Sequence, residues 1–129
     1  MKTLEEVRKI FEEDRFATEN GAVIEEIGAH SAVCSMVLTP SHRNAMGAVM
    51  GGVYFTLADF AFAVAANWEE MGCVSLHSDI SFLGAAKGEK LIAKAVCIKN
   101  GKRTACYRID VTDEHGNSTA TVTTTGYYV

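Results

Sequence analysis

The chain has 129 residues, of which 48% are hydrophobic, so it is long and apolar enough to bury a core of its own. Its formal net charge of −4 argues against a nucleic-acid partner, since nucleic acids favour basic surfaces. The four cysteines are widely spaced, and no pair has the spacing of metal ligands. We therefore expect no metal site and four reduced thiols in a cytoplasmic protein. The charged N-terminus does not have the composition of a signal peptide.

The first predicted element is a helix within TLEEVRKIFEED, residues 3–14. Thr3 and Glu6 have the spacing of a capping box, and the apolar residues that follow recur at helical intervals. Residues 22–38 alternate loosely between apolar and polar positions, which predicts two strands. Residues 39–50 hold the only proline together with Ser, Asn and Gly, and this composition predicts a loop.

The longest apolar run, GGVYFTLADFAFAVAANW at residues 51–68, predicts a buried helix. The run is short for a membrane span, and it carries Asp59 near its middle, where hydrocarbon would penalise a charge. We therefore expect a helix inside a globular core and no membrane partner.

The chain after Gly72 predicts strands. They fall in residues 73–83, 90–99, 103–113 and 118–129, and Asn100 with Gly101 predicts a two-residue hairpin turn between the second and third. A helix that is apolar all round must be enclosed. The sequence thus predicts an α+β fold, in which a strongly curved antiparallel sheet wraps around one long central helix. With an extra N-terminal helix, this makes a single domain over residues 1–129.

Asp59 is the one charged residue within the apolar run, and no Lys or Arg occurs between Arg43 and Lys87. A carboxylate buried alone is costly, so the protein must pair it, protonate it or use it. Two interpretations stay open from the residues alone. Asp59 either hydrogen-bonds a hydroxyl or lines a subunit contact, or it takes part in catalysis.

Gly51 and Gly52 stand at the start of the predicted helix, where the first N–H groups have no partner within the helix. Such an end favours an anion or a carbonyl oxygen that gains charge, although a tight turn into the helix also needs glycine. Eight positions separate Gly51 from Asp59, which is about 12 Å along a helix at ~1.5 Å per residue. One helix cannot bring both to one carbonyl, but two antiparallel copies can. A catalytic pair would therefore require at least a dimer.

The segment NAMGAVMGGVYFTLAD, residues 44–59, resembles the signature of the hotdog-fold thioesterases, in their PaaI-like branch. That signature is roughly N-x-x-G-x-x-H-G-G followed by a helix that contains L-A-D. Matching residues are Asn44, Gly47, Gly51, Gly52 and Asp59. The resemblance implies the hotdog fold and hydrolysis of a small, medium or aryl acyl-CoA thioester. It also implies a homodimer or a homotetramer built from two dimers, and no cofactor.

The resemblance also implies roles for individual residues. Asp59 would be the catalytic carboxylate, acting as general base on water or as nucleophile. The Gly51 N–H would hold the thioester oxygen, with Gly52 beside it at the substrate, and Asn44 would place the carbonyl or the water. Ser75 occupies a position where relatives carry Ser or Thr near the carboxylate.

Met50 departs from the signature, because the family has a histidine before the two glycines. Methionine carries no charge and donates no hydrogen bond. Two interpretations follow. The enzyme keeps its activity with Met50 lining a different acyl pocket, which we favour, or the chain is a non-catalytic protein that binds acyl-CoA or another small ligand.

Basic residues near two loops are the remaining candidates. Lys102 and Arg103 belong to a cluster at the predicted hairpin turn, where they would contact the CoA phosphates or form a solvated turn. His42 and Arg43, just before the motif, are expected at the surface or in contact with CoA.

Overall fold

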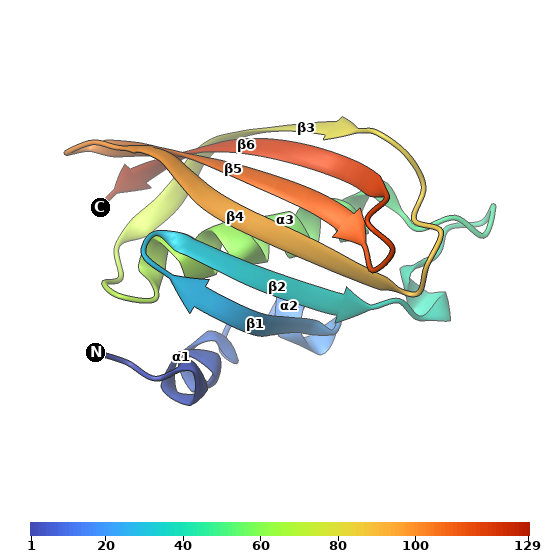
Figure 1. Ribbon diagram of the computed structural model, residues 1–129, viewed down its shortest axis with the longest axis horizontal. Coiled ribbons are helices and arrows are strands. Elements are labelled where there is room, and N and C mark those ends of the chain that lie inside the picture. Colours follow the sequence, from blue (N-terminus) through green and yellow to red (C-terminus); the bar gives the residue numbers. More distant parts are fainter.

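A computed structural model describes all of residues 1–129. Six antiparallel strands form one curved sheet in the order β1-β2-β4-β5-β6-β3, and the helix α3 lies along its concave face (Figure 1). The helices are α1 (Leu4–Phe11), α2 (Arg15–Glu19) and α3 (Gly51–Asn67), with a 3₁₀ turn η1 at Pro40–His42. The strands are β1 (Ala22–Gly28), β2 (Ser31–Val37), β3 (Cys73–Phe82), β4 (Lys90–Asn100), β5 (Thr104–Asp113) and β6 (Ser118–Tyr128). This is the predicted α+β architecture.

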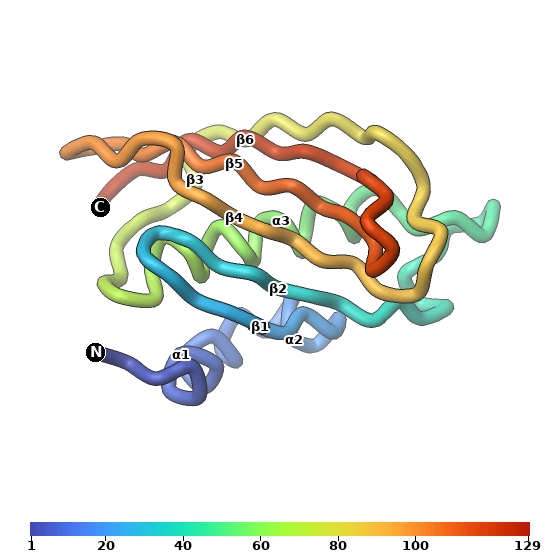
Figure 2. Tube along the Cα trace, viewed as in Figure 1, coloured from blue at the N-terminus to red at the C-terminus, as the bar shows by residue number.

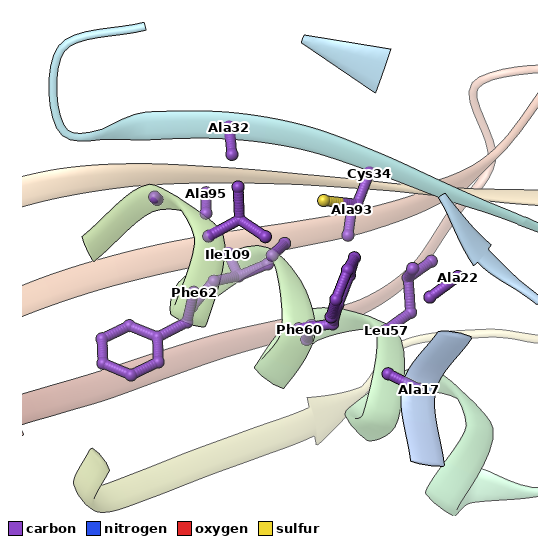
Figure 3. Close-up of a cluster of buried hydrophobic side chains, with 14 of the residues drawn as sticks. Ala17, Ala22, Ala32, Cys34, Leu57, Phe60, Phe62, Ala93, Ala95 and Ile109 are labelled. Carbon is purple, nitrogen blue, oxygen red and sulfur yellow. The ribbon is translucent and has the colours of Figure 1, made fainter. Parts of the chain in front are cut away.

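The core lies between α3 and the concave face of the sheet, because α3 contacts every strand. Figure 3 shows Leu57, Phe60 and Phe62 of the helix close to small side chains of the strands. Those small residues include Ala32, Cys34, Ala93 and Ala95, all buried. Their size lets the helix approach the sheet closely, so that a large side chain such as Leu57 gains about 1.5–3 kcal/mol from burial.

The C-terminal end of α3 is fixed by a single side-chain amide. Asn67 Nδ2 donates to the Ala63 and Cys73 carbonyls, at 3.0 and 2.9 Å. Its Oδ1 accepts from the Gly72 and Cys73 N–H groups, at 2.9 and 2.8 Å. Asn67 therefore ends the helix and starts β3, which runs back beside α3 in the opposite direction.

The N-terminal region differs in one respect from the sequence prediction. The capping box of Thr3 and Glu6 is confirmed, but the predicted helix over residues 3–14 ends at Phe11, and a second short helix, α2, begins at Arg15. Figure 1 shows both helices beside β1, at the edge of the sheet opposite β3. The break between the two helices allows α2 to turn toward α3.

The β4–β5 hairpin also differs from its prediction. The strands end at Asn100 and resume at Thr104, and the Gly101 N–H donates to the Thr104 carbonyl at 2.9 Å. The predicted position of the turn, at Asn100 and Gly101, is wrong, because this hydrogen bond encloses Lys102 and Arg103 and Asn100 still pairs with Ala105.

None of the helices combines the length and hydropathy that a membrane crossing requires. The most unusual exposed feature is instead β3, a ten-residue strand at the edge of the sheet. Large apolar side chains on it are exposed, namely Val74, Leu76 and Phe82. An open edge of this length is a template for pairing with another strand.

Candidate active site

One stripe of α3 faces away from the sheet and is only partly covered. Gly52, Thr56, Asp59 and Ala63 follow one another on it at helical spacing. Two adjoining pockets lie along this stripe, with volumes of about 380 and 80 Å³, and both are lined by Phe16 and Thr56. The larger contains Asp59, and the smaller contains Met50 and Gly52. Together they form what we call the α3 groove, which runs from the start of the helix to its only carboxylate.

Asp59 lies in this groove without a partner in its own chain, since its side chain makes no hydrogen bond or ion pair there. Burial, and secondarily the negative charge of Asp14, raise the pKa of Asp59 above its usual range. A carboxylate of this kind binds a proton more strongly than one in water. The first interpretation from sequence, a hydrogen bond to a hydroxyl, therefore finds no support within one chain.

Gly51 and Gly52 provide free backbone donors at the other end of the groove. Met50 is the N-cap residue of α3, and its side chain makes no capping hydrogen bond. Neither glycine N–H donates to another group of the chain. A Cβ at Gly51 would lie 3.1 Å from the ring of Phe82, so this glycine also lets β3 approach the helix. The helix start thus offers two donors to a ligand.

Met50 lies over the second glycine. Its Cε is 2.9 Å from the place where a Cβ on Gly52 would stand, and its side chain lines the smaller pocket beside Met36 and Phe16. Met50 therefore forms an apolar wall of the α3 groove, where the related motif has a histidine.

Asn44 organises the loop before α3. Its Oδ1 accepts from the N–H groups of Met46 and Ala48, at 3.0 and 3.1 Å, while no hydrogen bond is formed by its Nδ2. The loop projects beyond the end of the sheet, at the right of Figure 1 and Figure 2. Asn44 is exposed, and its Nδ2 is left without a partner in its own chain.

His42 is buried, so the expectation that it lies at the surface is wrong. The Thr39 N–H donates to His42 Nδ1 at 2.9 Å, which leaves the proton on Nε2, 2.7 Å from the Asn20 carbonyl. The His42 carbonyl accepts from the Met50 N–H at 2.9 Å. His42 therefore connects the end of α2 to the start of α3 and is not free to act as a base. Arg43 is exposed, as expected.

Ser75 lies near the start of β3, just before a bulge, and its side chain is exposed. Because β3 starts beside Asn67 and ends beside Gly51, Ser75 lies toward the C-terminal half of α3. Ser75 therefore lies on the open edge of the sheet.

Lys102 and Arg103 lie at the end of the molecule opposite to the start of α3, in the hairpin at the left of Figure 1. Lys102 lines a separate pocket of about 490 Å³ that also contains Glu69 and Glu70. Two carboxylates disfavour a phosphate there, and no single chain brings Lys102 to Gly51. The structure therefore argues against the predicted phosphate contact within one chain.

Two residues of the groove were not found from the sequence. Phe16, 75% exposed, lines both pockets, and Asp14 lines the larger one. The signal that could have found them is the acidic residue at position 14, an N-cap residue type, ahead of RFATE.

Comparison with known proteins identifies the family of this chain. The family model of the thioesterase superfamily matches residues 46–120. The acyl-coenzyme A thioesterase PaaI of Escherichia coli is 30% identical over 120 residues, which cover 92% of this chain and 86% of the relative. Human acyl-coenzyme A thioesterase 13 is 33% identical over 85 residues, or 64% of this chain and 61% of the human protein.

Solved structures share the fold over nearly the whole chain. The E. coli PaaI protein superposes with a TM-score of 0.89 at 26% identity, covering 98% of this chain and 96% of the other. Two variants of a hypothetical thioesterase from Streptococcus pneumoniae match with TM-scores of 0.79 at 26% and 25% identity. They cover 84% of this chain and 90% and 91% of theirs. One variant has alanine in place of a threonine, and the other has alanine in place of an aspartate. The aspartate lies sixteen positions before the threonine in the chain.

Proposed function

The chain belongs to the thioesterase superfamily and is a thioester hydrolase, and we propose that it hydrolyses acyl-CoA thioesters with Asp59 as its catalytic carboxylate. The observation that carries the assignment is the unpartnered, half-buried Asp59 in a groove that starts at two free backbone N–H groups. The names of the relatives support CoA as the carrier.

The reactive site is proposed to form between two copies of the chain. Gly51 and Asp59 are too far apart on one helix to reach a single carbonyl, at about 12 Å. Pairing of two β3 edges in antiparallel fashion would cover the exposed Val74 and Leu76 and set the two α3 helices antiparallel. Gly51 of each chain would then lie toward the Asp59 of the other. A homodimer, and a tetramer made from two such dimers, follow from this arrangement.

In the proposed reaction, Asp59 takes a proton from water, and the water oxygen attacks the thioester carbonyl carbon. The carbonyl oxygen gains negative charge and accepts a hydrogen bond from the Gly51 N–H of the partner chain. When the intermediate collapses, the C–S bond breaks, the acid leaves and the sulfur takes up a proton. Direct attack by Asp59, with an anhydride that water then cleaves, uses the same two groups. Both routes require the ionised carboxylate.

Ser75 and Asn44 are proposed to support this centre. Ser75 follows Asp59 by sixteen positions, the interval between the two replaced residues in the S. pneumoniae variants. Asn44 has a free Nδ2 on a loop that extends beyond the end of the sheet, where we propose that it meets the substrate. The acyl group is proposed to lie in the α3 groove against Phe16 and Met50, with Gly52 beneath it, in a cytoplasmic enzyme.

Thiol release from a panel of acetyl-, hexanoyl- and phenylacetyl-CoA tests the proposal. We expect turnover by the natural chain and a loss of kcat of about 10²–10⁴-fold in Asp59→Asn, because Asn cannot accept a proton. Glu26→Gln, the same change from carboxylate to amide at an exposed residue of β1 outside both pockets, serves as the matched control and should keep the rate. Full activity of Asp59→Asn would contradict the assignment. Saturable acyl-CoA binding without turnover by the natural chain would favour the non-catalytic alternative.

A further inference from the structure

We propose that Asp14 is a positioning residue that makes Asp59 a stronger base, by placing a second negative charge in the same pocket. The inference rests on the proposed function, in which Asp59 accepts the proton. It adds a residue from outside the motif that carries the family resemblance.

The two carboxylates belong to one pocket. Asp14 and Asp59 both line the larger pocket of the α3 groove, one from the start of α2 and the other from the middle of α3. Phe16, Phe55 and Phe60 line the same pocket. Phe60 is buried and Phe55 partly buried, so this apolar side of the pocket screens the repulsion between the two charges less than bulk water does.

The side chain of Asp14 forms no hydrogen bond or ion pair that would give it a structural role. It is the N-cap residue of α2, yet its side chain makes no capping hydrogen bond. An N-cap aspartate ordinarily accepts from the helix N–H groups, so this carboxylate has been left free to face the pocket. Asp14 is an exposed residue at the open side of the pocket, and the partial burial of its carboxylate raises the pKa of Asp14.

No other charge near Asp59 offsets this effect. Asp59 is the only charged residue of α3, and the sheet packs on the opposite face of that helix. Arg15 lines the pocket too, but its Nε donates to the Glu19 carboxylate at 2.7 Å. The Arg15 side chain is 73% exposed and paired with Glu19, so its charge is screened, and Asp14 is the charge that acts on Asp59.

The consequence for the reaction has a definite sign. The charge of Asp14 stabilises the protonated form of Asp59, so it raises the pKa of Asp59 beyond the effect of burial alone. A base with a higher pKa takes the proton of water more readily, provided that it is still ionised at the working pH. Removing the charge of Asp14 should weaken the base and extend its ionised range to lower pH.

The test is the pH profile of kcat/KM for Asp14→Asn, measured on the best acyl-CoA substrate with a thiol reagent that works in acid. Asn matches Asp in size and in N-cap preference, so the substitution removes charge and little else. We expect the acid limb to move to lower pH by roughly half a unit, while the plateau falls about two- to fivefold. Glu13→Gln, the same change of charge at an exposed neighbour outside the pocket, should alter neither.

An acid limb that stays in place in Asp14→Asn would overturn the inference, as would an equal shift in Glu13→Gln. Asp14→Glu should keep the natural profile, since it restores the charge. Asp59→Asn in the same assay separates the two claims. If it is inactive while the Asp14→Asn limb does not move, the proposed function stands and the role of Asp14 fails. If it is fully active, both fail.

Discussion

Asp59 and Asp113 are two carboxylates withdrawn from water in the same chain, with opposite surroundings. Asp113 is 1% exposed and accepts hydrogen bonds from four backbone N–H groups and from the Asn117 amide. Burial alone would raise its pKa, but those bonds outweigh it and hold the pKa of Asp113 well below its usual range. Asp59 has no such donor, and its pKa is raised.

The difference separates a structural carboxylate from a reactive one. The donors to Asp113 come from Lys87 and Gly88 on one side and from the β5–β6 turn on the other, so the ionised group ties two loops together. No group of its own chain donates a hydrogen bond to the ionised carboxylate of Asp59, so its oxygen atoms are free to accept a proton. Changing each carboxylate to the amide therefore should produce opposite results.

The largest effect on stability is expected from Asp113→Asn. The NH₂ group of the amide would face backbone N–H groups, which are also donors, so hydrogen bonds would be lost. We therefore expect Tm to fall by roughly 5–10 °C. Specific activity of the protein that remains folded should be preserved, since Asp113 lines neither pocket of the α3 groove. Thermal melts beside thiol-release assays check this, and an unchanged Tm would show that the bonds to Asp113 add nothing net.

The pH dependence of this loss follows from the lowered pKa of Asp113. The ionised carboxylate stabilises the fold when the pH is above its ordinary pKa of 3.8. That contribution disappears as the pH falls toward the lower pKa of the folded state. The difference in Tm between the natural chain and Asp113→Asn should therefore shrink in acid. A difference that grows as the pH falls would contradict the sign.

Asp59→Asn should change stability less and in the other direction. A raised pKa means that ionisation of Asp59 opposes folding at neutral pH, a penalty relieved as the pH falls through the folded pKa. We expect Tm to rise by roughly 1–4 °C at pH 7 in the amide variant, with a smaller gain near pH 4. A drop in Tm at pH 7 would indicate that Asp59 makes a stabilising contact in the assembled protein.

Met50→His should have the smallest effect. Met50 contributes an apolar wall and no hydrogen bond to the two glycine N–H groups, so we expect kcat to change by less than about threefold. Met50→Leu, which keeps the apolar wall, is the control. A large gain in rate for Met50→His alone would show that the natural residue weakens the site.

The sequence was informative where a residue type was out of place. Asp59 is recognisable because it interrupts an apolar run, and the enclosed helix follows from that run being apolar all round. The N-cap residue type of Asp14 signals the start of a helix, but its place in the groove was missed, because the break that turns α2 toward α3 depends on tertiary packing. His42 was misplaced for the same reason, since its partner Asn20 lies 22 positions away.

The contacts of Asp113 also could not be predicted. The segment TDEHGN indicates a turn, but two of its donors, Lys87 and Gly88, lie about 25 positions earlier in the chain. The position of Lys102 and Arg103 could not be predicted either, because a basic cluster in the sequence shows that charge is present but not where in the fold it lies. The directions in which β4 and β5 run relative to α3 decide which end of the molecule carries them.

The central claim is that Asp59 of one chain acts with the Gly51 N–H of another, and mixed dimers test it most directly. Gly51→Pro removes the N–H at the first helical position, where proline is tolerated, and Gly51→Ala keeps the N–H while it adds a Cβ against Phe82. Each of Gly51→Pro and Asp59→Asn should be nearly inactive alone. Refolded together, they should recover about a quarter of the natural activity, because each mixed dimer holds one intact site. A mixture as inactive as its two components would contradict a site shared between chains.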